Sequence, residues 1–290
     1  MAEIKETRYS IRYELLGLAF KLTTDNDEMH RYLEDVLEEH LVTSQEEPID
    51  VELFIPLIDL VKRRYLTRTA PDYASVLTDV KFGFGMPPIH NWRSTAPPLI
   101  PFNIEAIDGR FSAYHAAAIN AAEVGAVLLL GNKGAGKSTN ALALCKQQEW
   151  SLLSDETCVV RSRDLVVHAI LRQPHGYAVD SQNIARKMVL RFADNLWLKT
   201  KKEGDPVLAF ELIFIPGMVT PHAENVTDEK IAAQILTRHQ LQFGGTPEGA
   251  RECSRALAAK VKLIQIYHGG YENFPEVQKI IVGAANRMFK

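Results

Sequence analysis

A glycine-rich segment ahead of a helix-like stretch carries the clearest chemistry in the sequence. Gly131, Gly136, Lys137 and Ser138 satisfy the pattern GxxxxGK[ST] within GAVLLLGNKGAGKSTNALAL. Glycines let successive backbone amides point at phosphate oxygens, and the N-terminus of the following helix adds partial positive charge. The lysine adds a full charge, and the serine hydroxyl is a ligand for Mg2+. The sequence therefore predicts a nucleotide-phosphate site formed by Gly131, Asn132, Lys133, Gly134, Ala135, Gly136, Lys137, Ser138 and Thr139.

Two acidic residues follow this loop after the length of one helix. Asp155 and Glu156 end the apolar run SLL. A helix of about eleven residues and a tight turn use up the separation from Lys137. We therefore expect the strand before Asp155 to lie beside the strand of the loop, in a parallel pair, with its carboxylate where ligands bind in α/β sheets. The short spacing favours a kinase, whose acid must reach a metal and an acceptor hydroxyl, over motor and transport ATPases. An exposed acid pair at a strand end is the alternative.

A histidine lies upstream of the loop. His115 stands in the apolar stretch FSAYHAAAI, before the strand that enters the loop. Imidazole titrates near neutral pH and is often recruited for function. His115 is therefore a candidate site residue, and a core or surface histidine without a chemical role is the alternative.

These residues require alternating strands and helices to position them. Hydrophobic periodicity and turn residues indicate both kinds of element after residue 110. We expect strands at 111–119, 125–130, 151–162, 210–216 and 262–270, a helix ending at Gln148, and further helices at 228–242 and 275–289. Such alternation predicts an α/β core.

A proline-rich segment separates this core from the N-terminal part. Residues 86–101 read MPPIHNWRSTAPPLIP, and proline excludes a regular helix or a central strand. We therefore expect a small α+β N-terminal region at 1–86, a proline-rich linker at 87–109 and a phosphate-loop domain at 110–290.

The N-terminal region mixes strand-like and helix-like stretches. YSIRYELLGLAFKLT is rich in strand formers, whereas DNDEMHRYLEDVLEEHL has apolar residues at helical spacing. VELFIPLIDLV fits either a buried strand or a helix. No chemical motif is visible in this region.

Composition and charge exclude several classes of function. The formal net charge of -3 at pH 7 argues against a nucleic-acid partner. The three cysteines are widely spaced and form no CxxC pair, so neither a zinc ribbon nor a redox dithiol is indicated. The N-terminus lacks the apolar core of a signal peptide, and no apolar run approaches a membrane span. We expect a cytoplasmic protein that contacts no membrane, and its oligomeric state stays open.

Three of these segments together resemble a known family. YHAAAI, GAVLLLGNKGAGKSTNALAL and WSLLSDETCVV resemble the HPr kinase/phosphorylase family, and more closely its HPr-kinase-like relatives, which include lasso-peptide kinases. In that family a histidine precedes the loop strand, and a short helix joins the loop to an acidic pair. The resemblance covers residues 110–285, with its specific part at 111–160. It implies the fold that HPr kinase shares with phosphoenolpyruvate carboxykinase, a P-loop on a mixed sheet, with ATP and Mg2+ as ligands.

The resemblance also implies a role for each matched residue. Lys137 would hold the β- and γ-phosphates, and Ser138 would bind the metal. Asp155 would be the general base that takes the proton of the acceptor hydroxyl, close to the metal. Glu156 would bind the metal or support its ligands, and His115 would lie near the transferred phosphate.

The sequence departs from HPr kinase itself at several positions. Thr139 stands where HPr kinase has a glutamate, and the acidic pair is Asp-Glu instead of Asp-Asp. The Arg-Gly-Leu-Gly region of HPr kinase has no clear counterpart. Within the nearest segment, ILRQPHGYAV, Arg172 is the candidate for a cation beside the phosphates. These departures argue against an authentic HPr kinase and against its phosphorylase half-reaction.

The leading interpretation is an ATP-dependent kinase that transfers the γ-phosphoryl group, with Mg2+, to the hydroxyl of a peptide, a protein serine or a small molecule. One alternative is a nucleotide-binding regulator that hydrolyses ATP slowly without a dedicated acceptor. Another is a P-loop scaffold that keeps only residual nucleotide affinity. A fold alone does not decide among them.

Overall fold

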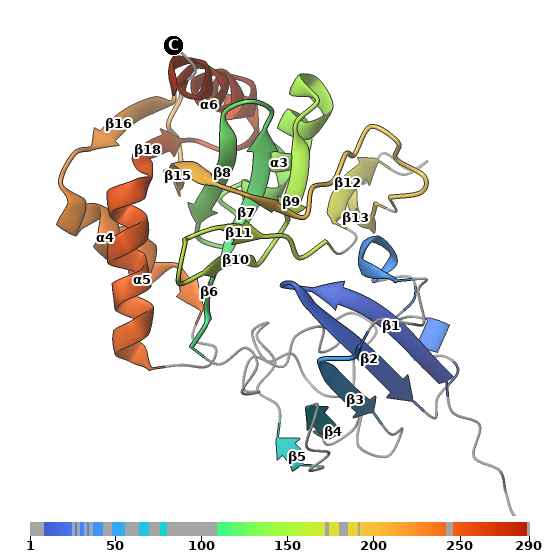
Figure 1. Cartoon of the computed structure of the whole chain (residues 1–290). Coiled ribbons are helices and arrows are strands. Elements are labelled where there is room, and N and C mark those ends of the chain that lie inside the picture. The colour runs from blue at the N-terminus through green and yellow to red at the C-terminus, as the bar shows by residue number, and fades with distance from the viewer. Residues whose placement is uncertain are drawn as a thin grey trace, which may run out of the picture. The chain divides into compact units, whose positions relative to one another are not determined.

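The computed structural model divides the chain into two compact units, Met1–Asp108 and Gly109–Lys290 (Figure 1). The residues that the structure describes are 9–24, 27, 30–31, 34, 37–42, 48–55, 64–69, 76–79, 109–171, 174–179, 185–190, 192–241 and 246–288. The predicted linker at 87–109 lies outside them except for residue 109, so it stays a prediction.

The N-terminal unit contains a five-stranded sheet in the order β1-β2-β3-β4-β5. Its strands are β1 (Tyr9–Leu15), β2 (Leu18–Thr24), β3 (Val51–Ile55), β4 (Arg64–Thr69) and β5 (Val76–Asp79). β1 and β2 form an antiparallel hairpin, and its turn residues Leu16 and Gly17 have φ of 58° and 72°. Positive φ at both positions suits the right-handed twist of the paired strands. The ambiguous segment VELFIPLIDLV is a strand over Val51–Ile55.

The expected helix at 25–41 is only partly described. Residues 27, 30, 31 and 34 are helical, and a 3-10 turn follows at Glu38–His40. The described part of this unit therefore contains both strands and helical residues.

The C-terminal unit is built on a six-stranded sheet in the order β16-β18-β15-β8-β7-β9. Its strands are β7 (Ala116–Ala121), β8 (Gly125–Gly131), β9 (Ser151–Ser154), β15 (Pro206–Phe214), β16 (His222–Val226) and β18 (Lys262–His268). β8, β15 and β18 run parallel, whereas β7 and β16 are antiparallel to their neighbours. β8 is buried along nearly its whole length, as expected for a central parallel strand. The unit is therefore α/β with a mixed sheet.

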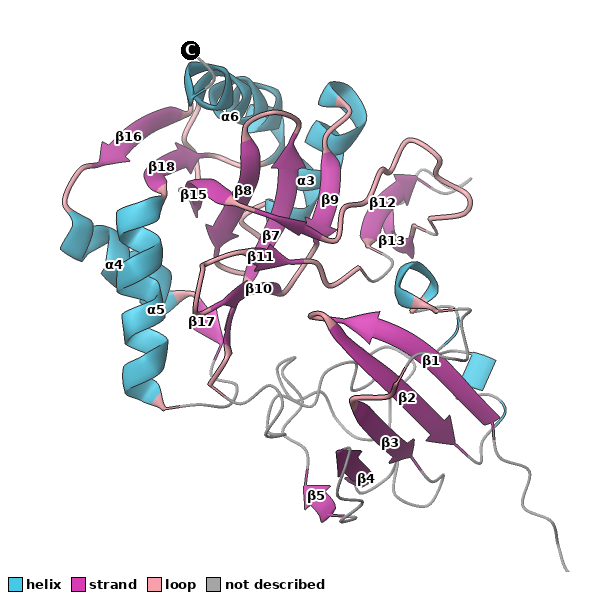
Figure 2. Cartoon of the chain, viewed as in Figure 1, coloured by secondary structure: helices cyan, strands magenta, loops and turns pink. Residues whose placement is uncertain are grey.

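Four helices accompany this sheet among the described residues (Figure 2). They are α3 (Lys137–Gln148), α4 (Glu229–Arg238), α5 (Pro247–Lys260) and α6 (Phe274–Met288). α3 packs against β7, β8, β9 and α6, while α4 packs against α5, which also contacts β18. No helix in the described part of the chain is both long and apolar enough to cross a bilayer.

Some of the helix boundaries expected from the sequence agree with the structure, and others do not. α3 ends at Gln148 as expected, and α6 has Pro275 in its first turn. α4 is shorter than the expected 228–242, because residues 240–241 form the short strand β17 (Gln240–Leu241). α5 was missed, although Thr246 caps it and Pro247 opens it, a recognisable start signal.

A second five-stranded sheet has the order β14-β11-β10-β6-β17. Its other strands are β6 (Phe111–Tyr114), β10 (Cys158–Arg161), β11 (Val167–His168) and β14 (Glu203–Gly204), and a separate hairpin pairs β12 (His175–Val179) with β13 (Ala185–Val189). The expected strands 111–119 and 151–162 are each split between the two sheets. The first breaks at His115, and the second breaks at residues 155–157.

The predicted position of the strand before Asp155 was wrong. β9 does not pair with β8, because β7 lies between them and is antiparallel to both. β8 and β9 therefore run in the same direction without touching as ladder partners. Their C-terminal ends still face the same edge of the sheet, so the loop and Asp155 share that edge.

Candidate active site

The predicted phosphate loop connects the end of β8 to the first turn of α3. Three glycines in it have positive φ: 146° at Gly131, 87° at Gly134 and 85° at Gly136. A Cβ at Gly131 would lie 2.7 Å from the Leu212 carbonyl oxygen, and one at Gly136 would lie 2.5 Å from Cζ of Phe274. Glycine is thus required at both ends of the loop for backbone conformation and for space.

The N-terminus of α3 opens directly onto this loop. Its cap residue, Gly136, offers no side chain, and no side-chain cap bond is made to the first turn. The first amides of a helix have no intrahelical acceptor and carry the positive end of the helix dipole. Ser138 and Thr139 in this turn are half-buried, whereas Asn132, Lys133 and Gly134 are exposed and Ala135 is buried. The loop therefore presents backbone donors together with accessible hydroxyls.

Lys137 is held against the loop. Its side chain is buried, and Nζ donates hydrogen bonds to the carbonyl oxygens of Gly131 at 2.8 Å and Asn132 at 3.2 Å. Burial lowers the pKa of Lys137, and the charges of Glu156 and Asp155 oppose that shift. Both acids therefore act electrostatically on this ammonium group.

The acids and His115 meet at the junction between the two sheets. Tyr114 pairs with Cys158 in one sheet and Ala118 pairs with Ser154 in the other. Residues 115–117 and 155–157 thus occupy matching positions between these pairs, and we call them the strand junction. Within it the Ser154 hydroxyl donates to the Thr157 carbonyl at 2.5 Å, which fixes the turn that carries both acids. Asp155 is buried and Glu156 is exposed.

His115 belongs to the same electrostatic cluster. Burial is the main cause that lowers its pKa, the charge of Lys137 lowers it further, and Glu156 opposes the shift. The ring of His115 is therefore neutral at physiological pH. The structure thus places His115, Asp155 and Glu156 within electrostatic range of Lys137, and the functional roles of these residues stay predictions. Arg172 lies outside the described residues, so its expected position beside the phosphates stays a prediction.

Sequence reasoning missed a buried carboxylate next to this cluster. Glu211 lies on β15, level with Leu130 on β8, and its side chain is only 8% exposed. Its Oε1 lies 3.0 Å from Nη2 of Arg238 and 3.0 Å from Nε2 of His239, and Gln265 Nε2 donates to Oε2 at 2.7 Å. Burial raises the pKa of Glu211, and the bonds from His239 and Gln265 with the charge of Arg238 outweigh it, so the net shift is downward.

This buried network is connected to the strand junction through the backbone. The amide of His115 donates to the carbonyl oxygen of His239 at 2.7 Å. The side chain of His239 is fixed by Glu211, so the polar contacts around Glu211 also fix the chain at His115. A charged residue inside the apolar run AFELIF was the signal in the sequence, because a buried carboxylate needs partners.

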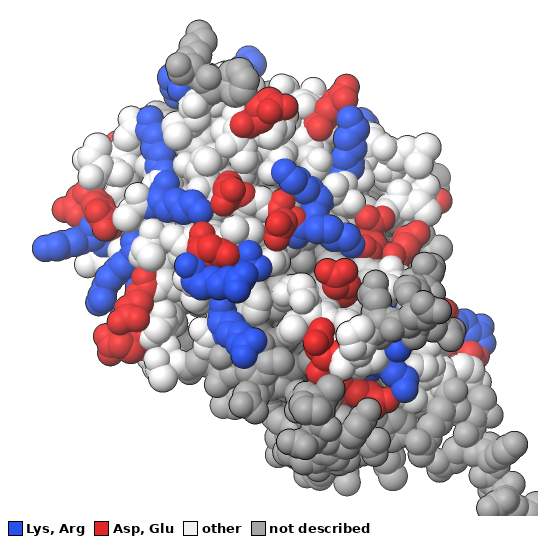
Figure 3. All heavy atoms as spheres, in the orientation of Figure 1, with Lys and Arg blue, Asp and Glu red and all other residues white. Residues whose placement is uncertain are grey.

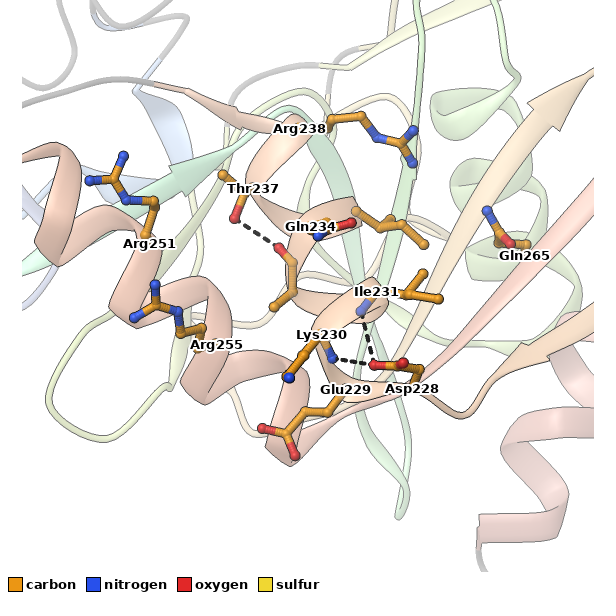
Figure 4. A pocket seen from close by; sticks show the side chains of 12 residues that line it. Asp228, Glu229, Lys230, Ile231, Gln234, Thr237, Arg238, Arg251, Arg255 and Gln265 are labelled. Carbon is orange, nitrogen blue, oxygen red and sulfur yellow. Dashed lines mark hydrogen bonds between the residues drawn. The ribbon is translucent and has the colours of Figure 1, made fainter.

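A pocket of about 1330 Å³ lies over α4 (Figure 4). Lys230, Arg238, Arg251 and Arg255 give its wall more basic than acidic side chains. None of the predicted site residues lines it. Two of its lining residues, Arg238 and Gln265, contact Glu211. On the face drawn in Figure 3, the Lys and Arg side chains are interspersed with Asp and Glu.

The described residues contain no group of three or more His, Cys, Asp or Glu side chains placed to hold a metal. Mg2+ is commonly held by one or two carboxylates together with the phosphates of a substrate. Asp155 and Glu156, which both lie at the strand junction, supply the number of carboxylates that this mode uses.

Comparisons with known proteins give a distant structural neighbour. No protein-family model and no curated protein sequence matches the chain. The solved structure of the Hpr(Ser) kinase/phosphatase from Coxiella burnetii is similar at 12% sequence identity, over 61% of this chain and 99% of that chain, with a TM-score of 0.35. That similarity is too low to support a conclusion about function.

Proposed function

We propose that the chain is an ATP-dependent kinase that transfers the γ-phosphoryl group to a hydroxyl acceptor with Mg2+. The observation that carries this proposal is the strand junction, which places His115 and the two acids within electrostatic range of Lys137. Asp155, a buried carboxylate at the same sheet edge as the loop, would serve both a metal and an acceptor hydroxyl there. The resemblance of residues 111–160 to HPr-kinase-like proteins supports the same class.

Phosphate binding would use the loop and the first turn of α3. The backbone amides of Gly136, Lys137 and Ser138 and the ammonium group of Lys137 would neutralise the β- and γ-phosphates. Ser138, Asp155 and Glu156 would hold Mg2+, which supplies charge neutralisation at the transferred group. Positioning and charge account for most of the catalysis in phosphoryl transfer.

The chemical step would use Asp155 as the general base. Its carboxylate takes the proton of the acceptor hydroxyl, the hydroxyl oxygen bonds to the γ-phosphorus, and the bond between that phosphorus and the β,γ-bridging oxygen breaks to release ADP. Neutral His115 would offer a hydrogen bond to the transferred group. Glu211 would act through His239 by holding the backbone at His115.

A labelled-ATP screen against peptides and small alcohols tests this proposal. We expect Mg2+-dependent transfer of the γ-label to one class of hydroxyl acceptor. Release of inorganic phosphate with no labelled acceptor would favour a regulator with slow ATPase activity. A folded chain that neither binds ATP nor responds to Mg2+ would favour a scaffold.

A further inference from the structure

Four aromatic rings form a continuous row at the ends of β15 and β18. Phe214 and His268 are cross-strand neighbours at the last positions of these strands, with ring centroids 6.1 Å apart. His268 lies 5.5 Å from Phe274, and Phe274 lies 5.0 Å from Tyr271, again between centroids. We call these four residues the aromatic row.

The inner part of the aromatic row touches the phosphate loop. Phe274 leaves room for nothing larger than glycine at Gly136. The backbone of Ala135 is close enough to His268 to favour its protonated ring, although burial dominates and lowers the pKa of His268. Both inner rings are buried. They therefore support the loop and connect it to the two outer rings.

The outer part of the aromatic row is exposed to solvent. Tyr271 is 65% exposed and Phe214 is 50% exposed, and the nearby residues Ile215 and Val219 are also exposed. Exposed apolar residues that gather in one place mark binding sites. Tyr271 and Phe214 pack at tilted angles of 54° and 52° against the buried rings Phe274 and His268, and offer exposed aromatic surface beside the loop.

The turn that carries Tyr271 is fixed by hydrogen bonds. The amide of Gly269 donates to Oδ1 of Asn273 at 2.5 Å, and Nδ2 of Asn273 donates to the carbonyl oxygen of Val219 at 2.8 Å. A Cβ at Gly269 would lie 2.0 Å from the Met218 carbonyl oxygen, so the two segments are in direct contact. A surface held in this way can bind a planar group with little loss of conformational entropy.

The position of the aromatic row relative to the acids determines what it would bind. The sheet order places β7 and β9, with Asp155, on one side of β8, and places β15 and β18, with the aromatic row, on the other. A triphosphate whose reacting end meets Asp155 must extend its other end across the loop, away from the acids. That end carries the nucleoside.

We propose that Tyr271 and Phe214 form the surface on which the base of the bound nucleotide stacks. This inference rests on the proposed nucleotide site and adds to it the residues that recognise the base. Stacking on an aromatic ring suits every base, because each has a π face. The contribution of the base to nucleotide affinity can therefore be measured separately from that of the phosphates.

Calorimetric titration with ATP and with inorganic triphosphate, each with Mg2+, tests the proposal. We expect the wild-type chain to bind ATP more tightly than triphosphate, and Tyr271→Ala to weaken ATP binding roughly tenfold while leaving triphosphate binding unchanged. Tyr271→Phe keeps the ring and should keep the affinity within about twofold of wild type. Leu196→Ala removes an apolar side chain that is 89% exposed elsewhere, and serves as the matched control.

The outcomes separate the base site from the phosphate site. If Tyr271→Ala and Phe214→Ala both leave ATP affinity unchanged, the base lies elsewhere while the phosphate site stands. Loss of self-association in these variants, with ATP affinity intact, would overturn the proposal by assigning the patch to a second copy of the chain. A wild-type chain that binds neither ligand overturns both the base site and the proposed function.

Discussion

Nζ of Lys137 donates a 2.8 Å hydrogen bond to the carbonyl oxygen of Gly131, so the first residue of α3 reaches back to the first residue of the loop. A second bond to the Asn132 carbonyl, at 3.2 Å, holds the ammonium group at the same place. The positive charge therefore lies inside the curve of the loop, where phosphates would bind. The charges of Glu156 and Asp155 at the strand junction act on this ammonium group and raise its pKa against the effect of burial.

Substitution of Asp155 tests the chemistry at this junction. Asp155→Asn keeps the size of the side chain and removes its basicity, so we expect phosphoryl transfer to fall roughly 100- to 10,000-fold. Rates at saturating ATP and acceptor measure the effect. Asp164→Asn, at an exposed acid paired with Arg161, is the control. Near-normal transfer by Asp155→Asn would rule out its role as the base.

Two glycines of the loop allow a matched test of how tightly the loop packs against its neighbours. Gly134 and Gly136 have similar positive φ, 87° and 85°, but only Gly136 has a neighbour where a Cβ would stand. Alanine at Gly134 should cost about 1–2 kcal/mol of unfolding free energy for the backbone alone. Alanine at Gly136 should cost roughly 1–3 kcal/mol more, because it meets Phe274.

The additional cost at Gly136 should depend on Phe274. In the Phe274→Leu background the penalty of Gly136→Ala should shrink, and a double-mutant cycle from urea unfolding measures the coupling. Equal penalties for the two alanine variants would show that Phe274 does not press on the loop.

The contacts of Glu211 predict a larger effect on stability than an exposed ion pair would give. Glu211→Gln removes the charge that Arg238 and His239 share, and should lower the unfolding free energy by about 1–3 kcal/mol. Glu224→Gln, at an exposed residue paired with His222, should change it by no more than about 0.5 kcal/mol. Chemical denaturation of both variants at neutral pH makes the comparison, and equal losses would argue against the role of Glu211 in holding the structure.

Three histidines make folding stability sensitive to mild acid. Burial is the first cause that lowers the pKa of His115, His168 and His268. The unfolded chain therefore takes up protons first, near pH 6.5, and stability should be lost as pH falls below that value toward the folded-state pKa values. Glu211, whose pKa is lowered from 4.5, loses its contribution only at more acidic pH.

His268→Asn tests this pH dependence. Asparagine does not titrate, and its side-chain oxygen can accept the hydrogen bond from the Gly270 amide that Nδ1 of His268 accepts at 3.2 Å. Unfolding free energies measured between about pH 7.5 and about pH 5.5 should fall less in the variant than in the wild type. An identical fall in unfolding free energy in the variant and the wild type would show that groups other than His268 cause the pH dependence.

The loop and α3 could be predicted because their determinants are local. Gly131 and Gly136 indicate a turn, and the helix begins within a few residues of them. The strand that pairs with β8 is decided by the length of a connection. Only a few residues separate the strands expected at 111–119 and 125–130, whereas two parallel strands need a crossover of about a dozen residues. β7 therefore had to form an antiparallel hairpin with β8, which excluded β9 from that flank.

Other features of the site had no local signal. The strands that carry His115 and Asp155 each pass from one sheet to the other, and nothing in FSAYHAAAI or SLLSDETCVV marks the break. The bond from the His115 amide to the His239 carbonyl joins residues far apart in the sequence, so it exists only in the folded chain. Glu211 could have been flagged as a buried charge, but its partners could not.

Calorimetric titration of ATP with Mg2+ into the wild type and Lys137→Met tests the central claim most directly. We predict that the wild-type chain binds one nucleotide in a Mg2+-dependent manner, and that Lys137→Met weakens binding at least roughly tenfold while its unfolding transition stays cooperative. Equal affinity in the two proteins, or no binding by a folded wild-type chain, would contradict the assignment of the loop as the nucleotide-phosphate site.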